Sequence, residues 1–386
     1  MSNATQRWTD NFLDAKRLQA DPLADAVLLQ MVNEQGEDAA RRLFDELIRR
    51  IEMPLNAFPA VIQDFLKQTN QLPDWIDWDK VALANRLFLD HGPKFLIFLY
   101  YKSLPLLYCC KNGAQVLVQT GRLTHQEETH KIFARRIAET GQFLLEVMAP
   151  DALRPGGKGI QAIQKVRLIH ASIRRFIPED HWDVHTLGKP INQEDMALTQ
   201  LTFSVAITDA LAQFGVQEDE ALQEAYVHTW AAIAALLGVD EDLLPKDLSD
   251  ARFLLEKILQ RQAAESEAGK TLTKALSAFL KETVPSEKLN NVPGTLIRYF
   301  IGAERAPMLG IIPAGGCLTA LVPDFLATFF RLGERLEAKL DEPLRPLLEQ
   351  LSQKTMQKMV AFFDEYKGRN FAVPEVLERA WNVSEK

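Results

Sequence analysis

The chain has 386 residues, of which 47% are hydrophobic and 25% are charged, a composition typical of globular proteins. Its formal net charge of −8 excludes a broad nucleic-acid footprint, which needs clustered Lys and Arg. No CxxC or CxxCH motif occurs and two of the cysteines are adjacent, which favours a reducing compartment over a disulfide framework; they are Cys109, Cys110 and Cys317.

The N-terminal segment, residues 1–27, has no apolar core after a basic start, so we expect no signal peptide and a cytoplasmic location. The longest apolar run is FLIFLYYKSLPLLYCC, Phe95–Cys110, which Lys102 and Pro105 interrupt. It is too short to span a bilayer. We therefore predict no membrane span, and a buried helix or a tunnel wall at this place.

The period of the apolar residues is helical almost throughout the chain. AQVLVQT, Ala114–Thr120, alternates instead and is a candidate for a short strand after the turn KNG. The segment LTHQEETHKIFARRIAETGQFLLEVM is predicted to be a helix from about His125 to about Met148, because Thr124 and Glu127 have capping-box spacing.

Two further helices have clear ends. PINQEDMALTQLTFSVAITDALAQFGV can be capped at Asn192 and closed by Gly215, and its apolar residues surround the helix, which predicts a central position. EDEALQEAYVHTWAAIAALLGV is closed by Gly238, and a more exposed helical stretch begins at Leu248. The linkers are short, and the flexible PGGKG, residues 155–159, lies too near the middle of the core to separate domains. We predict an all-α single domain with globin-like packing and peripheral helices.

An apolar stripe with a histidine at its centre runs through KVRLIHASIRRF. Its members have helical spacing and are Ile163, Val166, His170, Ile173 and Ile177. A histidine among aliphatic side chains is expected to be partly buried and needs partners for its ring nitrogens. The partner can be a backbone carbonyl, a carboxylate or a metal, and the arginines Arg167 and Arg174 flank the ring.

The preceding helix has a similar irregularity. Its apolar stripe is Phe133, Ile137, Thr140, Leu144 and Val147. Thr140 interrupts this stripe, Gly141 follows it, and Arg136 lies one turn before. A mid-helix glycine costs about 1 kcal/mol relative to alanine, which is tolerable if something must approach the backbone closely. A haem fits these residues, although by periodicity alone a structural core histidine is the commoner interpretation.

The other histidines give weaker signals. None of the seven forms HExxH or another close zinc pattern; they are His91, His125, His130, His170, His181, His185 and His228. His181 and His185 are interpreted as solvated loop residues rather than a metal pair. His228 lies on a small-residue, alanine-rich helix face, which indicates close helix packing with the ring bonded to a carbonyl, or else a second wall of a ligand tunnel.

Four segments carry a resemblance to a known family: TGRLTHQEETHKIFARRIAETG, GGKGIQAIQKVRLIHASIRRFI, DMALTQLTFS and AYVHTWAAIAALLGVDEDLLP. Their joint pattern resembles the bacterial rubber oxygenases (latex-clearing proteins) and the related fungal oxygenases of mycophenolic acid synthesis, formerly a family of unknown function. The resemblance covers about Asp21–Pro245, and RYFIGAERAPMLGI is a later, weaker match. We assign residues 1–386 to one all-α domain, with a family-like haem-binding core at about 21–245 and a peripheral helical part at about 246–386.

The resemblance implies roles for individual residues. The family's RxxHxxxR element falls on Arg167, His170 and Arg174, which makes His170 the proximal ligand of a b-type haem iron. The family's arginine and threonine on the preceding helix fall on Arg136 and Thr140, both against the haem. The three arginines would serve the propionates or orient ligands.

Two departures from the rubber-cleaving enzymes bear on the substrate. The lysine that precedes the family's threonine is Glu139 here, and LVQTGRL lacks the family's upstream catalytic glutamate. Glu127, Glu128 or Glu139 are the carboxylates that could replace it. Because the rubber enzymes are exported and this chain is expected not to be, a smaller apolar substrate, such as an unsaturated one, is favoured over polyisoprene.

The resulting hypothesis is a haem b-dependent oxygenase that uses dioxygen on an apolar terpenoid or lipid-like substrate, with Glu139, Thr140 and Arg136 as catalytic candidates. The first alternative is a non-catalytic haem or lipid carrier or sensor. The second is a plain helical interaction protein in which His170 is only a core residue. The sequence predicts no nucleic-acid partner and leaves the oligomeric state open.

Overall fold

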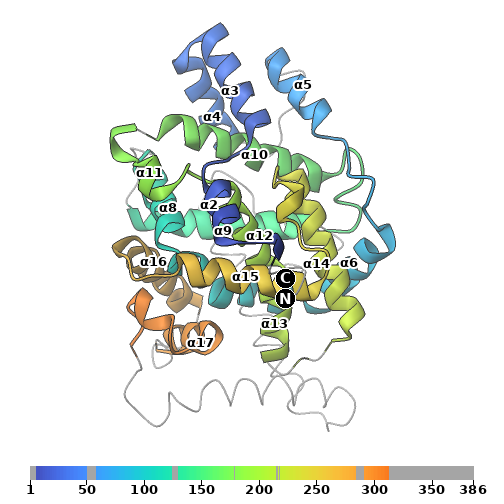
Figure 1. The fold of residues 1–386 in the computed structure, drawn as a ribbon, viewed down its shortest axis with the longest axis vertical. Coiled ribbons are helices and arrows are strands. Elements are labelled where there is room, and N and C mark those ends of the chain that lie inside the picture. Colours follow the sequence, from blue (N-terminus) through green and yellow to red (C-terminus); the bar gives the residue numbers. More distant parts are fainter. Residues whose placement is uncertain are drawn as a thin grey trace, which may run out of the picture.

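The computed structural model describes residues 6–49, 58–123, 129–177, 179–213, 216, 218–283 and 291–312. Every secondary-structure element in these ranges is a helix or a helical turn (Figure 1). Within these ranges the only β-type pairing is an isolated bridge between Cys110 and Ala263. The predicted all-α class is confirmed. None of the described helices is long and apolar enough to cross a membrane.

The helical elements follow one another with short connections. In chain order they are α2 (Asp10–Arg17), α3 (Pro22–Gln35), α4 (Glu37–Arg49), α5 (Ala60–Gln68), α6 (Trp78–Phe98), the π-helical turn η2 (Leu99–Ser103), α7 (Leu104–Cys109), α8 (Lys111–Leu123), α9 (Thr129–Met148), α10 (Lys158–Phe176), η3 (Glu179–His181), α11 (Val184–Leu187), α12 (Gln193–Phe203), α13 (Val205–Gln213), α14 (Glu220–Leu236), η4 (Glu241–Leu243), α15 (Leu248–Gln262), α16 (Glu267–Thr283), α17 (Val292–Ile301) and η6 (Ala306–Leu309).

Predicted helix ends are confirmed where local chemistry sets them. The Asn192 side chain accepts the amide of Asp195 and caps α12. Gly238 follows α14 with a φ of 87°, a backbone conformation that favours glycine. α9 ends at Met148 as expected, whereas its predicted capping box at residues 124–127 lies outside the described residues.

The single helix predicted from Asn192 to Gly215 is wrong in one respect, because the chain breaks at Ser204. This residue has φ −104° and ψ −95° and separates α12 from α13. Its hydroxyl accepts a hydrogen bond from the Gln200 side chain (3.2 Å) and donates to the Leu201 carbonyl (3.5 Å), so a side chain binds a backbone group at the break. Gly215 itself lies outside the described residues. The predicted central position is confirmed, since α12 is buried along most of its length.

The short strand predicted at Ala114–Thr120 is wrong, because this segment is part of α8. Val116 and Thr120, four residues apart, are both buried, and the Thr120 hydroxyl donates to the Val116 carbonyl (2.8 Å). Val116 packs in a small cluster with Ile177 and Trp182. Tertiary packing of one helical face therefore overrides the local strand preference.

The apolar run Phe95–Cys110 is a buried helical segment, as predicted, but it is not one regular α-helix. The π-helical turn η2 joins α6 to α7 in its middle. All five residues of η2 are buried, including Tyr100 and Lys102. π-Helical turns are rare and occur frequently at functional sites.

Helix α10 lies between two apolar clusters. On one side α3, α4 and α5 form an outer layer, which Figure 1 shows beyond α10 at the end of the molecule away from α13 and α17. Their side chains pack with Leu168, Ala171 and Phe176 of α10. On the other side Ile160 and Ile163 join the main core. α10 also packs against α9 and α14, so its residues connect both layers.

The stretch after Leu248 is less peripheral than we expected. One face of α15 contributes Leu254 and Ile258 to the main core, and α16 contributes Leu276, all three fully buried. α16 packs against α7, α8 and α9. Most of the apolar segment Gly310–Phe330 lies outside the described residues.

Candidate functional site

His170 occupies the middle of the predicted stripe on α10. The stripe is buried at both ends, at Ile163 and Ile177, and half-buried at Val166, His170 and Ile173. The Nδ1 atom of His170 is shielded from solvent and has no hydrogen-bond partner among the described residues. Burial, with a smaller effect of Arg174, lowers the pKa of His170 to about 4, so the ring is neutral near pH 7. A neutral imidazole with an open nitrogen has the chemistry of a metal ligand.

Arg167, one turn before His170, donates to protein groups from all three of its guanidinium nitrogens. Its Nε and Nη2 donate to the two carboxylate oxygens of Asp21 (2.5 and 2.9 Å), and its Nη1 donates to the Leu236 carbonyl (3.2 Å). Asp21 also caps α3. A Cβ at Gly238 would lie 2.8 Å from both Arg167 and Asp21. Only glycine at this position leaves enough space for the Arg167–Asp21 pair. Arg167 therefore joins α10 to α3 and α14.

Arg174, one turn after His170, is held differently. Its Nε donates to Asp25 of α3 (2.7 Å) and its Nη1 to the carbonyl of Ile191 (3.4 Å). Its Nη2 is buried and has no partner among the described residues. Ile191 has a φ of 52°, unusual for a β-branched residue, and lies directly before the cap of α12. The face of α10 thus carries an open imidazole nitrogen and an open guanidinium nitrogen one turn apart.

The predicted residues of α9 are half-buried on the neighbouring helix. Arg136 Nη1 donates to the Leu117 carbonyl of α8 (2.6 Å), and the Thr140 hydroxyl donates to the carbonyl of Arg136 (2.8 Å). Glu139 lies on the same turn as Thr140. The structure therefore groups His170, Arg167 and Arg174 on α10 and joins Arg136 to the backbone of α8. The side chains of Phe133 and Ile137, also predicted to belong to this wall, are not among those described.

The close approach expected at Gly141 occurs, and the group that approaches is Tyr100 of η2. A Cβ at Gly141 would lie 2.5 Å from the Tyr100 hydroxyl. Tyr100 is 1% exposed, its ring meets Phe279 of α16 edge to face at 5.5 Å, and its hydroxyl has no partner among the described residues. Gly141 was visible in the sequence, but no spacing rule connects it with a residue about forty positions earlier.

Four of the remaining histidines have other partners or are exposed, while His125 and the side chain of His130 are not among the described parts of the chain. His91 Nε2 lies 2.6 Å from the Glu218 carboxylate. His228 Nε2 accepts the backbone amide of Asp77 (2.9 Å), so the predicted bond from its ring to a carbonyl is wrong. His181 and His185 are exposed, as expected. Among the described residues no group of three or more His, Cys, Asp and Glu side chains could hold a metal ion.

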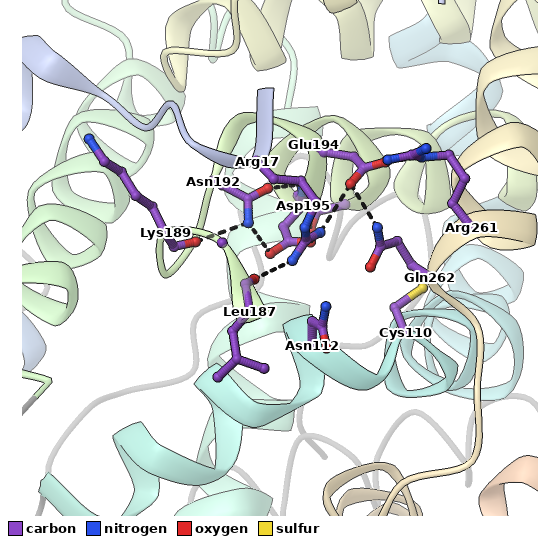
Figure 2. A network of polar contacts seen from close by, with 12 residues as sticks. Arg17, Cys110, Asn112, Leu187, Lys189, Asn192, Glu194, Asp195, Arg261 and Gln262 are labelled. Carbon is purple, nitrogen blue, oxygen red and sulfur yellow. Dashed lines mark hydrogen bonds and ion pairs between the residues drawn. The ribbon is translucent and has the colours of Figure 1, made fainter. Parts of the chain in front are cut away.

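A buried polar network, which we did not predict, fixes the start of α12 (Figure 2). Glu194 is fully buried and accepts hydrogen bonds from Arg17 of α2 (3.0 Å) and Arg261 of α15 (2.9 Å). Its neighbour Asp195 accepts from Arg17 (3.2 Å) and from Asn192 (2.8 Å). Burial raises the pKa of Asp195 to about 6. The network holds the turn whose Ile191 carbonyl contacts Arg174.

Fold and site together define a helical protein in which one face of the buried helix α10 carries a neutral histidine and an arginine that the described residues pair incompletely. The family model of the ER-bound oxygenase mpaB/B′ and rubber oxygenase catalytic domain matches residues 103–352. The chain therefore belongs to this family and is an oxygenase, an oxidoreductase class that generally works with a metal, haem or other cofactor.

Individual relatives agree with this assignment. A rubber oxygenase of Streptomyces sp. (strain K30) is 24% identical over 298 residues, which are 75% of this chain and 70% of that protein. The structure of latex clearing protein LCP in the closed state has a TM-score of 0.72 with 22% identity, covering 89% of this chain and 91% of that one. At this identity the structural likeness establishes the fold.

Proposed function

We propose that the chain is a haem b-dependent oxygenase in which His170 ligates the iron. The observation that carries the proposal is the buried Nδ1 atom of His170, which has no hydrogen-bond partner in the described structure. The lowered pKa keeps the ring neutral, and a neutral imidazole can ligate a metal. An unpaired buried polar atom is unfavourable, and a metal bond removes that penalty. The family assignment supports dioxygen as co-substrate.

Residues on the packed helices α10 and α9 have the chemistry that binding a haem requires. Val166 and Ile173 are half-buried aliphatic side chains on the same face of α10, and Leu144 and Val147 are buried on α9. Apolar side chains of this kind suit the faces of a porphyrin. Its carboxylates suit guanidinium groups, which bind carboxylates with charge-assisted hydrogen bonds. Arg136, Arg167 and Arg174 are the arginines that the family pattern assigns to this task.

When bound, haem supplies the one-electron and dioxygen chemistry that protein side chains lack. The side chains hold, orient and protonate. We assign proton movement to Glu139, whose half-buried carboxyl lies on the turn of Thr140. Thr140 now donates to a carbonyl of its own helix, so its hydroxyl can turn toward a ligand by rotation about one bond. Arg136 supplies a positive charge one helical turn before Thr140 on α9.

We further propose an apolar, unsaturated substrate of terpenoid or lipid-like chemistry. The names of the relatives point to rubber, an apolar polymer, as the substrate of those proteins. In this chain Glu139 stands where the rubber-cleaving pattern has a lysine, which favours a different, smaller substrate. We place the reaction in a reducing compartment, the cytoplasm, because Cys109 and Cys110 are both buried free thiols.

The test is an absorption spectrum of protein expressed in haem-replete cells. We expect a Soret band in the wild type that is lost or shifted in His170→Ala and unchanged in His181→Ala, because His181 is an exposed histidine of η3. Oxygen uptake with a reductant and a panel of terpenoid and fatty substrates then tests turnover. Wild-type protein without haem from such cells would refute the proposal.

A further inference from the structure

The two arginines that flank His170 are equivalent in the sequence pattern but not in the structure. Each pairs with an acidic residue of the first part of α3, Arg167 with Asp21 and Arg174 with Asp25. The pairs differ in how many guanidinium nitrogens the protein itself uses. That difference decides which arginine can still bind a ligand.

Each of the three nitrogens of Arg167 already donates to a protein group. Asp21 binds it with both carboxylate oxygens, the Leu236 carbonyl takes the third nitrogen, and the Asp21 side chain is only 2% exposed. Gly238 closes over the pair, since even a Cβ there would collide with it. A ligand carboxylate at Arg167 would have to displace a buried bidentate carboxylate, which is unfavourable.

Arg174 keeps one nitrogen open in a fixed position. Asp25 and the Ile191 carbonyl hold Nε and Nη1, which orients the planar guanidinium, while Nη2 is buried without a partner in the described residues. The side chain is 7% exposed, so bulk water does not solvate this donor freely. The guanidinium is close enough to His170 to lower the pKa of its ring.

We propose that Arg174, through Nη2, binds a propionate carboxylate of the haem ligated by His170, and that Arg167 is a structural clamp that binds no ligand group. The inference rests on the proposed function. It reduces the arginines of α10 that bind the haem from two to one, because the family pattern assigns both of them to the haem. A carboxylate at Nη2 forms a charge-assisted hydrogen bond and satisfies a donor that is otherwise left buried and unpaired.

The experiment compares binding of haem and of its dimethyl ester, in which both carboxylates are blocked, to apoprotein variants by Soret titration. The wild type is expected to bind haem about tenfold or more tightly than the ester, as for loss of a charge-assisted hydrogen bond. In Arg174→Gln the ratio of the two dissociation constants, that of the ester over that of haem, falls toward one. In Arg167→Gln it stays within about twofold of the wild-type ratio, because no ligand bond is removed.

The preference is a ratio measured on the same variant, so general loss of stability cancels. If Arg167→Gln does not fold because Asp21 is left unpaired, the Asp21→Asn/Arg167→Gln double variant removes both charges and takes its place. Preference lost in the Arg167 variant, or retained in Arg174→Gln, overturns the inference while leaving haem binding intact. A wild type that takes up neither haem nor the ester overturns the proposed function as well.

Discussion

Lys102 is a charged residue that is buried within an apolar segment of the core. It lies in η2, is 7% exposed, and its Nζ donates to the Gln213 side chain (2.7 Å). Burial lowers the pKa of Lys102 to about 8, against an ordinary value of 10.5, with Asp209 raising it and Arg252 lowering it. The folded protein therefore holds this proton less firmly than the unfolded chain does.

The sign of the pH effect follows from this difference. Between about pH 8 and pH 10.5 the unfolded chain keeps the Lys102 proton and the folded chain has lost it, so this residue makes stability rise with pH in that window. Below pH 8 the buried charge costs about 3 kcal/mol, as an order of magnitude. We expect Lys102→Met to be more stable than wild type at pH 7, with an advantage about 2 kcal/mol smaller at pH 9.5.

Urea unfolding of both proteins at the two pH values measures this difference. Lys67→Met is the matched control, because Lys67 lies on α5 with a side chain that is 72% exposed. Its stability difference from wild type should not change with pH. A Lys102→Met advantage that is the same at pH 7 and pH 9.5 would show that the amine is not desolvated as the structure indicates.

At the scale of elements, the contact between η2 and α9 depends on a glycine. The π-helical turn brings the Tyr100 hydroxyl against the α9 backbone at Gly141, next to Thr140 of the candidate site. Both features are unfavourable alone, since a mid-helix glycine costs about 1 kcal/mol and an unpaired buried hydroxyl about 1–3 kcal/mol. Their occurrence together fixes how closely the two elements pack.

We predict strong coupling between these residues. Gly141→Ala should destabilise the wild type by about 1–3 kcal/mol, because its Cβ would collide with the Tyr100 hydroxyl. In Tyr100→Phe the oxygen is absent and the nearest ring atom lies 3.7 Å from that Cβ. There the same substitution should be neutral or stabilise by up to about 1 kcal/mol through helix propensity. A double-mutant cycle by denaturant unfolding measures the coupling; equal effects in both backgrounds would contradict it.

At the scale of the whole molecule, Glu194 joins three helices that are far apart in sequence. Arg17 and Arg261, from α2 and α15, meet on this fully buried carboxylate, and Gln262 donates to it as well (3.0 Å) (Figure 2). Arg261 continues the network to Asp10 and Asp14 at the surface. Two helices that are distant in sequence, α2 and α15, are thereby fixed to the buried helix α12.

Loss of this charge is expected to affect the whole fold. Glu194→Gln leaves the buried Arg17 and the half-buried Arg261 without their common counter-charge, and breaking such a buried ion pair typically destabilises by about 3–5 kcal/mol. Asp209→Asn removes a carboxylate from the more exposed Asp209–Arg252 pair (2.7 Å) and should change stability by about 1 kcal/mol or less. Thermal and denaturant unfolding compare them. If both substitutions changed the free energy of unfolding by the same amount, the buried network would contribute little to stability.

Local features of the sequence determined much of this protein. The 3.6-residue period predicted an all-α fold, Asn192 and Gly238 predicted their helix ends, and the stripe around His170 predicted a partly buried imidazole. These predictions succeed because caps and helical faces depend on backbone geometry over a few residues. The joint likeness of four segments further predicted the oxygenase family that the family model establishes.

Only the tertiary structure decided which groups meet. Asp21 lies 146 residues from Arg167, and no spacing in the sequence indicates that it pairs with that arginine, while Nη2 of Arg174 has no partner among the residues that the structure describes. The break at Ser204 and the helical state of Ala114–Thr120 likewise oppose local preferences. The physical reason is the same in each case: burial and pairing energies come from residues distant in the chain, and they outweigh propensities of a few tenths of a kcal/mol to about 1 kcal/mol per residue.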